Sequence, residues 1–163
     1  MAAALLQLPT LSMSPVVWQD EVQTIEYGRQ LFDGATDASV VLESGLRPAG
    51  SLNYLGSWLQ EAMFRLAGGS YLAPRLVNLL AATAAALLAA AWLKNRGVIA
   101  PAASLAALLF FIDPCFERSY RGGRIEGLVF LVVMAFCWLL SQPSGKSRWH
   151  PWLAGALAGV IPW

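Results

Sequence analysis

Residues 72–93 read LAPRLVNLLAATAAALLAAAWL, and this stretch decides the class of the protein. A transmembrane helix needs roughly 20 consecutive, mainly apolar residues, and this stretch supplies them. Its many alanines also suit close packing against neighbouring helices inside a membrane. We therefore expect a membrane-spanning helix from Leu72 to Leu93.

The composition of the whole chain agrees with a membrane protein. Of its 163 residues, 57% are hydrophobic and 13% are charged, and the mean hydropathy is +0.54. A soluble domain carries about 25% charged residues. The charges are also clustered, which leaves long apolar runs between them. We expect an all-α, polytopic transmembrane helix bundle.

Other apolar segments flank the first. Residues 1–17 contain Pro9 and Pro15 and lack a basic leading region, so we expect a short or truncated first transmembrane segment rather than a signal sequence. Spans are also expected at about 98–112 and 125–141, each with a core of about 15 residues, or roughly 22 Å of helix. A last run, 152–163, would be an incomplete span, and the chain looks cut off there.

The basic residues between the spans predict an orientation. Lys94, Arg96, Lys146 and Arg148 lie in short turns without acids, which is typical of the cytoplasmic side. The first loop, residues 18–70, and the second loop, residues 113–124, would then both be exocytoplasmic. Their polar side chains would share one face of the membrane.

The first loop is long, and its pattern predicts helices. Apolar residues recur at helical spacing over residues 18–32, leaving Thr24 and Tyr27 among others on a polar side. Residues 54–66 form a second amphipathic piece. Because both pieces carry tryptophan or tyrosine, we expect interfacial helices that lie along the membrane surface.

The acidic pair Asp20-Glu21 follows the first apolar segment, where the chain would meet the membrane interface. One interpretation is structural: Asp20 with Gln23 three residues later is typical of a capping box, and Glu21 would complement the helix N-terminus. The other is chemical: a carboxylate at this boundary is placed to act as general base on a substrate with its tail in lipid. A residue can serve both roles.

The second loop combines a helix-start signal with arginines. Asp113-Pro114 is a good helix start, so capping is one interpretation of Asp113. Arg118, Arg121 and Arg124 recur every three residues and would form one stripe on a helix, unless Gly122-Gly123 breaks it.

Arginine favours planar, bidentate partners such as phosphates, which makes these side chains candidates for holding a phosphate. The alternative is a set of ion pairs with Glu117 and Glu126, or contact with lipid headgroups. Arg75, at the outer end of residues 72–93, would either join the same phosphate site or extend to the interface.

The sequence contains no pattern typical of a disulfide, a zinc site, a nucleotide-binding loop or a nucleic-acid interface. Cys115 and Cys137 lie in different environments and predict neither a disulfide nor a metal pair, and His150 is the single histidine. We expect no zinc site and no nucleotide-binding loop; whether a divalent metal is needed stays open. The basic residues are few and dispersed, so no nucleic-acid partner is expected.

Taken in order, several stretches resemble the GT-C glycosyltransferases. Trp18-Gln19-Asp20-Glu21, leading into residues 25–31, resembles the first exocytoplasmic loop of the family 39, dolichyl-phosphate-mannose protein mannosyltransferase-like enzymes of bacteria. Residues 51–55, 74–78 and 113–126 resemble later stretches of the same enzymes, although the usual proline pair of the first is reduced to Pro48.

The resemblance implies a fold, a site and partners. The chain would supply the first four or five of a larger number of spans, in the bacterial inner (plasma) membrane. Asp20 would be the catalytic base of an inverting transfer, with Glu21 assisting. Arg124, with Arg121 or Arg75, would hold the lipid phosphate of a polyprenyl-phosphate sugar, and the acceptor is not indicated.

Two details complete these expectations. Asp113 would lie at the substrate side of the second loop. The alternative function is a non-catalytic membrane scaffold or accessory subunit, in which the same acids only cap and solvate interfacial helices.

Overall fold

The computed structural model describes residues 2–13, 19–33, 54–142 and 149–160. Within them every long element is an α-helix and no strand occurs, which confirms the predicted all-α class. The helices are α1 (Ala2–Gln7), the short 3-10 helix η1 (Leu8–Thr10), α2 (Gln19–Phe32), α5 (Tyr54–Leu66), α6 (Leu72–Asn95), α7 (Ala100–Phe111), α8 (Pro114–Arg121), α9 (Glu126–Leu140) and α10 (His150–Val160).

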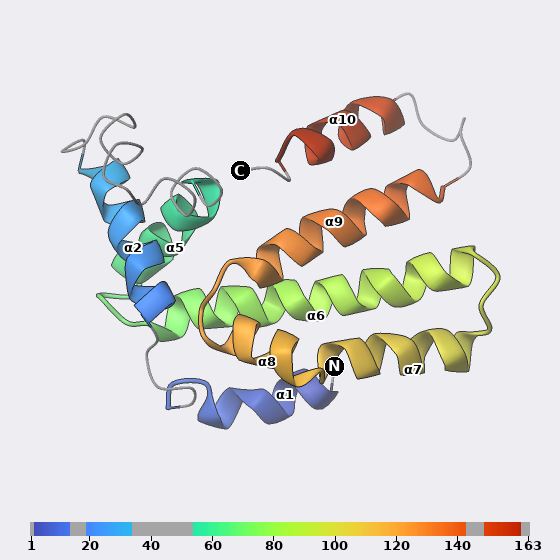
Figure 1. The fold of residues 1–163 in the computed structure, drawn as a ribbon, viewed down its shortest axis with the longest axis horizontal. Helices are drawn as coiled ribbons and strands as arrows, with labels where there is room; N and C mark the ends of the chain where they lie inside the picture. The colour runs from blue at the N-terminus through green and yellow to red at the C-terminus, as the bar shows by residue number, and fades with distance from the viewer. Residues whose placement is uncertain (1, 14–18, 34–53, 143–148, 161–163) are drawn as a thin grey trace.

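Helix α6 runs through the middle of the molecule, with α7 on one side and α9 on the other (Figure 1). Gly127, at the start of α9, lies against Asn78 near the start of α6. At the far end the Asn95 side chain donates a hydrogen bond to the Ser141 hydroxyl at 3.2 Å. The two helices therefore run in the same direction. The turn after α6 and the end of α9 lie at one end of the molecule, and residues 122–127 lie at the other.

A small apolar core joins the N-terminal segment to α6, α7 and α8. Its buried members are Leu11, Leu79, Ala82, Ala86, Phe111, Phe116 and Tyr120. Helices α7 and α8 meet at a 60° bend, and the Tyr120 hydroxyl donates to the Phe111 carbonyl at 3.2 Å across it. Pro114 at the first position of α8 fits this new start, since proline tolerates the first helical turn. The bend sets the second loop beside the start of α6.

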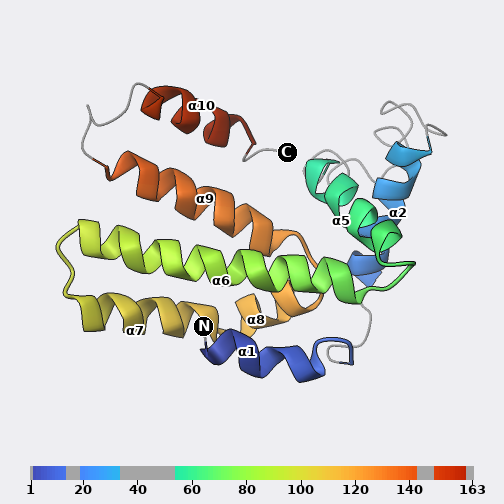
Figure 2. The same cartoon turned by 180° about the vertical axis from the view of Figure 1, so that it is seen from behind.

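Helices α2 and α5 pack together beyond the start of α6, as both views of the chain show (Figures 1 and 2). Gly28 allows this close approach, because a Cβ there would overlap the Ser57 carbonyl oxygen. The predicted bounds, 18–32 and 54–66, agree with the helices, but the predicted polar side of α2 does not face water. Thr24 and Tyr27 are buried.

This helix pair buries polar residues beside apolar ones such as Ile25. Polar residues Glu21 and Thr24 of α2, and Gln60 and Glu61 of α5, are buried. Other apolar side chains lie outside, and Trp58 is 44% exposed. Burial of polar groups is favourable when they have hydrogen-bond partners, and the contacts described below provide partners for Glu21, Gln60 and Glu61.

One helix among the described residues, Leu72–Asn95, is long and apolar enough to cross a membrane. The bent pair α7–α8 adds a second candidate if it counts as one span, and α9 is apolar but shorter. The helices overlap the segments predicted at 72–93, 98–112, 125–141 and 152–163. Their role as four separate spans stays a prediction.

Candidate functional site

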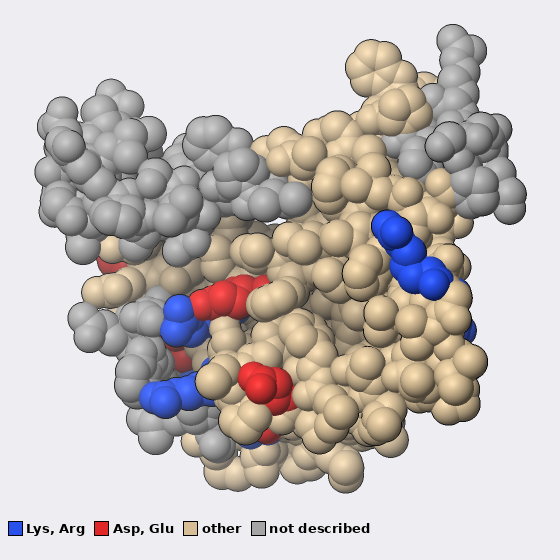
Figure 3. Space-filling model, turned by 45° about the vertical axis from the view of Figure 1, so that its right-hand side comes forward, with Lys and Arg blue, Asp and Glu red and all other residues tan. Residues whose placement is uncertain are grey.

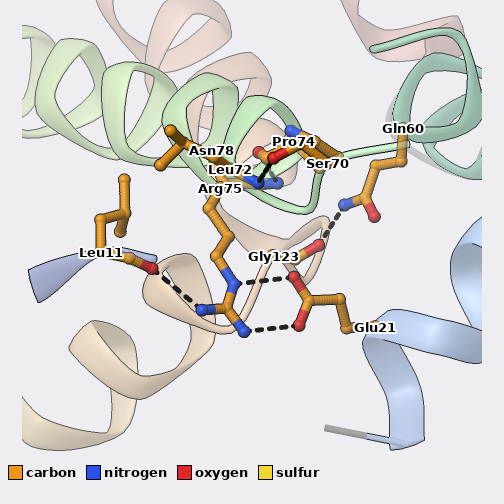
Figure 4. Close-up of polar contacts among 9 residues, drawn as sticks. All are labelled: Leu11, Glu21, Gln60, Ser70, Leu72, Pro74, Arg75, Asn78 and Gly123. Carbon is orange, nitrogen blue, oxygen red and sulfur yellow. Dashed lines mark hydrogen bonds and ion pairs between the residues drawn. The ribbon is translucent and has the colours of Figure 1, made fainter. Parts of the chain in front are cut away.

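A buried ion pair links the first loop to the long helix. The Arg75 guanidinium donates from Nε to Glu21 Oε1 at 2.9 Å and from Nη2 to Glu21 Oε2 at 2.8 Å (Figure 4). The third nitrogen, Nη1, donates to the Leu11 carbonyl at 2.9 Å. The Glu21 side chain is 0% exposed and the Arg75 side chain is 1% exposed. This is the bidentate arginine–carboxylate geometry, so the charge of Arg75 is already matched by Glu21.

Gly123 brings the second loop to the same place. Its φ of +67° lies in the left-handed region that favours glycine, and a Cβ would overlap Glu21 Oε1. Its carbonyl accepts a hydrogen bond from Gln60 Nε2 of α5. One residue of the second loop thus contacts both helices of the first loop, as the close-up shows (Figure 4). The two loops therefore meet in the structure, while their shared exocytoplasmic face stays a prediction.

The Asp113 side chain caps α8. Its Oδ1 accepts hydrogen bonds from the backbone N–H groups of Cys115 and Phe116, at 3.0 and 3.1 Å. These are two of the donors that a helix start leaves unpaired. The structural interpretation of Asp113 is therefore confirmed, and its carboxylate lies on the surface rather than at the buried Glu21–Arg75 pair.

The three arginines of the second loop do not form one stripe. Helix α8 ends at Arg121, with Gly122 as its cap, so the glycine pair does break the helix. Arg121 is buried and points at the N-terminal segment, where its Nη2 donates to Thr10 Oγ1 at 2.8 Å. Arg124 lies beyond the break and pairs with Glu126 at 2.5 Å.

Asp20 is the second residue of α2. The helix begins one residue before it, so Asp20 lies inside the first turn rather than at the position preceding the helix. Its side chain lies outside the described residues, and so do Lys146 and Arg148. The predicted catalytic role of Asp20 stays a prediction, while its backbone is placed next to the Glu21–Arg75 pair.

The sequence did not single out the polar seam between α2 and α5. Glu61 is buried there and accepts from Arg65 Nε at 2.5 Å, while Arg65 Nη2 reaches Asp33 at 2.7 Å. These bonds to Glu61 and Asp33 raise the pKa of Arg65 above its ordinary value. Burial raises the pKa of Tyr27 in the same seam. Its signal in the sequence was Gly28 on the polar side of α2, since a glycine inside a helix often marks a close contact.

In the part of the chain that the structure describes, no group of three or more His, Cys, Asp or Glu side chains is placed to hold a metal ion. The carboxylates near Gly123 pair with arginines instead, as in the Glu21–Arg75 and Arg124–Glu126 pairs. The arrangement can therefore fix the two loops together and present arginine side chains beside them.

The chain was also compared with known proteins. No protein-family model, no curated protein and no solved structure matches it. The resemblance to the GT-C glycosyltransferases therefore stays an expectation from the sequence.

Proposed function

We propose that this chain is the N-terminal part of an integral-membrane glycosyltransferase that transfers a sugar from a polyprenyl-phosphate donor to an acceptor on the exocytoplasmic face. The observation that carries the proposal is the junction at Gly123, where the acid-bearing first loop meets the arginine-bearing second loop. Both loops meet at the start of α6, the one described helix that is long enough for a full span.

The exposed apolar surface supports a membrane environment. Only 33% of the most apolar stretch of α6 is buried within the chain, whereas the core helix of a soluble protein would be mostly buried. Leu80, Leu105 and Leu109 are each more than half exposed. The space-filling view shows a broad surface with few charged side chains (Figure 3). A soluble monomer rarely exposes so much contiguous apolar surface, which lipid chains would cover.

The exposed apolar side chains of the α2–α5 pair support an interfacial position. Its outward side carries Val22, Leu55, Trp58 and Leu66, all at least 40% exposed. Helices at a membrane interface insert such a side among the lipid headgroups and upper acyl chains. Several of its buried polar residues have partners within the protein: Glu21 bonds Arg75, and Gln60 bonds the Gly123 carbonyl.

The positions of the charges support the proposed orientation. Lys94 and Arg96 follow α6 at the end where Asn95 bonds Ser141, and basic turns of this kind favour the cytoplasmic side. The Gly123 junction, at the opposite end, would then be exocytoplasmic. A bacterial plasma membrane fits this arrangement.

The proposed chemistry divides the work between the two loops. The acceptor oxygen bonds to the anomeric carbon of the sugar as the bond from that carbon to the donor phosphate breaks, and the acceptor proton passes to Asp20. Arg121 and Arg124 stabilise the charge on the released lipid phosphate. Glu21 is a positioning residue here, because its carboxylate is held by Arg75 next to the backbone of Asp20.

The test is Asp20→Asn, with Glu26→Gln as the matched control. Glu26 lies on the same helix, and its ion pair with Arg29 is about half exposed. Membranes that contain the full-length parent protein receive polyprenyl-phosphate mannose, and release of polyprenyl phosphate is measured. We expect Asp20→Asn to lower the rate at least roughly 100-fold, since a general base contributes about 10²–10⁴. The Glu26→Gln rate should stay close to that of wild type. Undiminished activity of Asp20→Asn would refute the role of Asp20.

A specific observation also favours the alternative, a non-catalytic scaffold. Glu21, Arg75 and Asp113 all have structural partners in the chain. A scaffold predicts that Asp20→Asn changes thermal stability modestly and that wild-type membranes release no polyprenyl phosphate. The same two measurements therefore separate the two functions.

A further inference from the structure

The N-terminal residues Ala2–Thr10, here called the strap, lie beside α8 in both views of the chain (Figures 1 and 2). No residue of α1 or η1 is buried, and Leu5 and Leu6 are more than 60% exposed. The next residue, Leu11, is fully buried in the core. The strap is therefore held by polar contacts and by the small side chains of Ala3 and Ala4 against the core, and Leu11 anchors its end.

Those polar contacts converge on one guanidinium. Arg121 Nη1 donates to Gln7 Oε1, and Arg121 Nη2 donates to Thr10 Oγ1 at 2.8 Å and reaches the Thr10 carbonyl at 3.4 Å. Three oxygen atoms of the strap thus face the two terminal nitrogens of one arginine. Two oxygens of a phosphate would face a guanidinium in the same fork arrangement.

The Gln7 amide lies between opposite charges. Its Nε2 donates to Glu117 Oε1 at 2.9 Å, while its oxygen accepts from Arg121. Arg121 and Glu117 are themselves 3.9 Å apart, one helical turn from each other. If the strap leaves, this pair stays close, so Arg121 does not lose every partner when it opens.

We infer that the strap is a built-in competitor for the phosphate group of the substrate at Arg121: the phosphate oxygens displace Gln7 and Thr10, and residues 2–10 swing away about Leu11. The inference rests on the proposed function. The low burial of the strap makes it the kind of segment that opens locally, since few apolar contacts hold it.

Closure of the strap lowers the apparent affinity for phosphate by the fraction of molecules that are open. The Thr10→Val variant keeps the shape of the side chain and removes the hydroxyl oxygen that Arg121 contacts at 2.8 Å. A hydrogen bond to a charged group contributes enough that its loss should tighten phosphate binding by roughly tenfold. Thr83→Val is the matched control, because the Thr83 hydroxyl bonds only to the Leu79 carbonyl of its own helix among the described contacts.

The experiment follows hydrogen exchange of residues 2–10 in lipid nanodiscs that contain the full chain. One arm has a polyprenyl phosphate in the bilayer, and the other has inorganic phosphate in the buffer. We expect the lipid to increase hydrogen exchange of the strap severalfold while the middle of α6 stays protected. We also expect Thr10→Val to bind the lipid more tightly than either wild type or the Thr83→Val control does.

Each outcome decides something. If the lipid binds and the strap stays protected, or if Thr10→Val binds no more tightly than wild type, the strap inference is overturned and the proposed function stands. If neither wild type nor either variant binds polyprenyl phosphate, the strap inference and the proposed function are both overturned. If inorganic phosphate alone releases the strap, the competition is supported and the lipid source is overturned.

Discussion

Replacement of Glu21 by glutamine tests whether the buried ion pair organises this end of the molecule. The change keeps the shape of the side chain and removes its charge. Arg75, which is 1% exposed, would keep its positive charge without a carboxylate beside it. Leaving one member of a buried pair uncompensated costs about 3–5 kcal/mol.

This cost is large enough to measure. In a chain of this size 1 kcal/mol corresponds to about 2–4 °C in Tm, so Glu21→Gln should lower the Tm by about 6–20 °C. The exposed pair of Glu26 with Arg29 provides the comparison, because such a pair contributes about 0–1 kcal/mol. Glu26→Gln should therefore shift the Tm by less than about 4 °C.

The assay is thermal unfolding of the purified chain, followed by tryptophan fluorescence in one fixed lipid or detergent. A double variant, Glu21→Leu with Arg75→Met, removes both charges, and it should recover much of the loss because neither charge is then buried alone. Equal Tm shifts for Glu21→Gln and Glu26→Gln would refute the reasoning. A double variant as unstable as the sum of its two single changes would also refute it.

Three further predictions follow from single contacts. Gly123→Ala should destabilise the protein by about 2–5 kcal/mol in denaturant unfolding, because the new Cβ adds left-handed strain and overlaps Glu21. The control Gly68→Ala has the same φ but open space around it, so it should cost only about 1–2 kcal/mol. Equal costs for the two variants would contradict the overlap. Asp113→Ala should cost about 1 kcal/mol, while Asp113→Asn keeps most of the cap; a loss of transfer activity in Asp113→Asn without this pattern would argue for a substrate role. Burial raises the pKa of Tyr27 in the folded state. The neutral Tyr27 therefore contributes fully to the free energy of unfolding below about pH 10, and this contribution is lost as the pH rises through the folded-state pKa. Tyr27→Phe should therefore lose less stability than wild type in an alkaline titration, and an unchanged titration would contradict the burial argument.

Local features of the fold could be predicted from the sequence. Apolar runs gave the positions of α6, α7 and α9, because an uninterrupted apolar stretch has few alternatives to a helix in a chain of this composition. The Asp113-Pro114 start and the break at Gly122-Gly123 depend on neighbouring residues only, so they too were within reach.

Partner choice over long distances could not be predicted. Glu21 and Arg75 are 54 positions apart, and nothing near either residue indicates that they pair. From the sequence we expected Glu21 to assist catalysis and Arg75 to bind phosphate, whereas the two side chains bind each other. Periodicity likewise defined the two sides of α2 and α5 without saying which side faces inward. Gly28 lets the two backbones approach, and Arg65 of α5 joins the pair by its bond to Asp33 at the end of α2.

The contacts also rank the arginines by how readily a phosphate could reach them. Arg75 would have to give up a fully buried carboxylate, at a cost of about 3–5 kcal/mol, so it is a poor phosphate ligand. The Arg124–Glu126 pair is partly exposed, and such pairs contribute only about 0–1 kcal/mol. Arg121 would exchange the neutral oxygens of Gln7 and Thr10 for charged ones, with Glu117 still 3.9 Å away. A phosphate should therefore meet Arg124 first and Arg121 second, and Arg75 should hold the loop that carries Asp20 in place throughout.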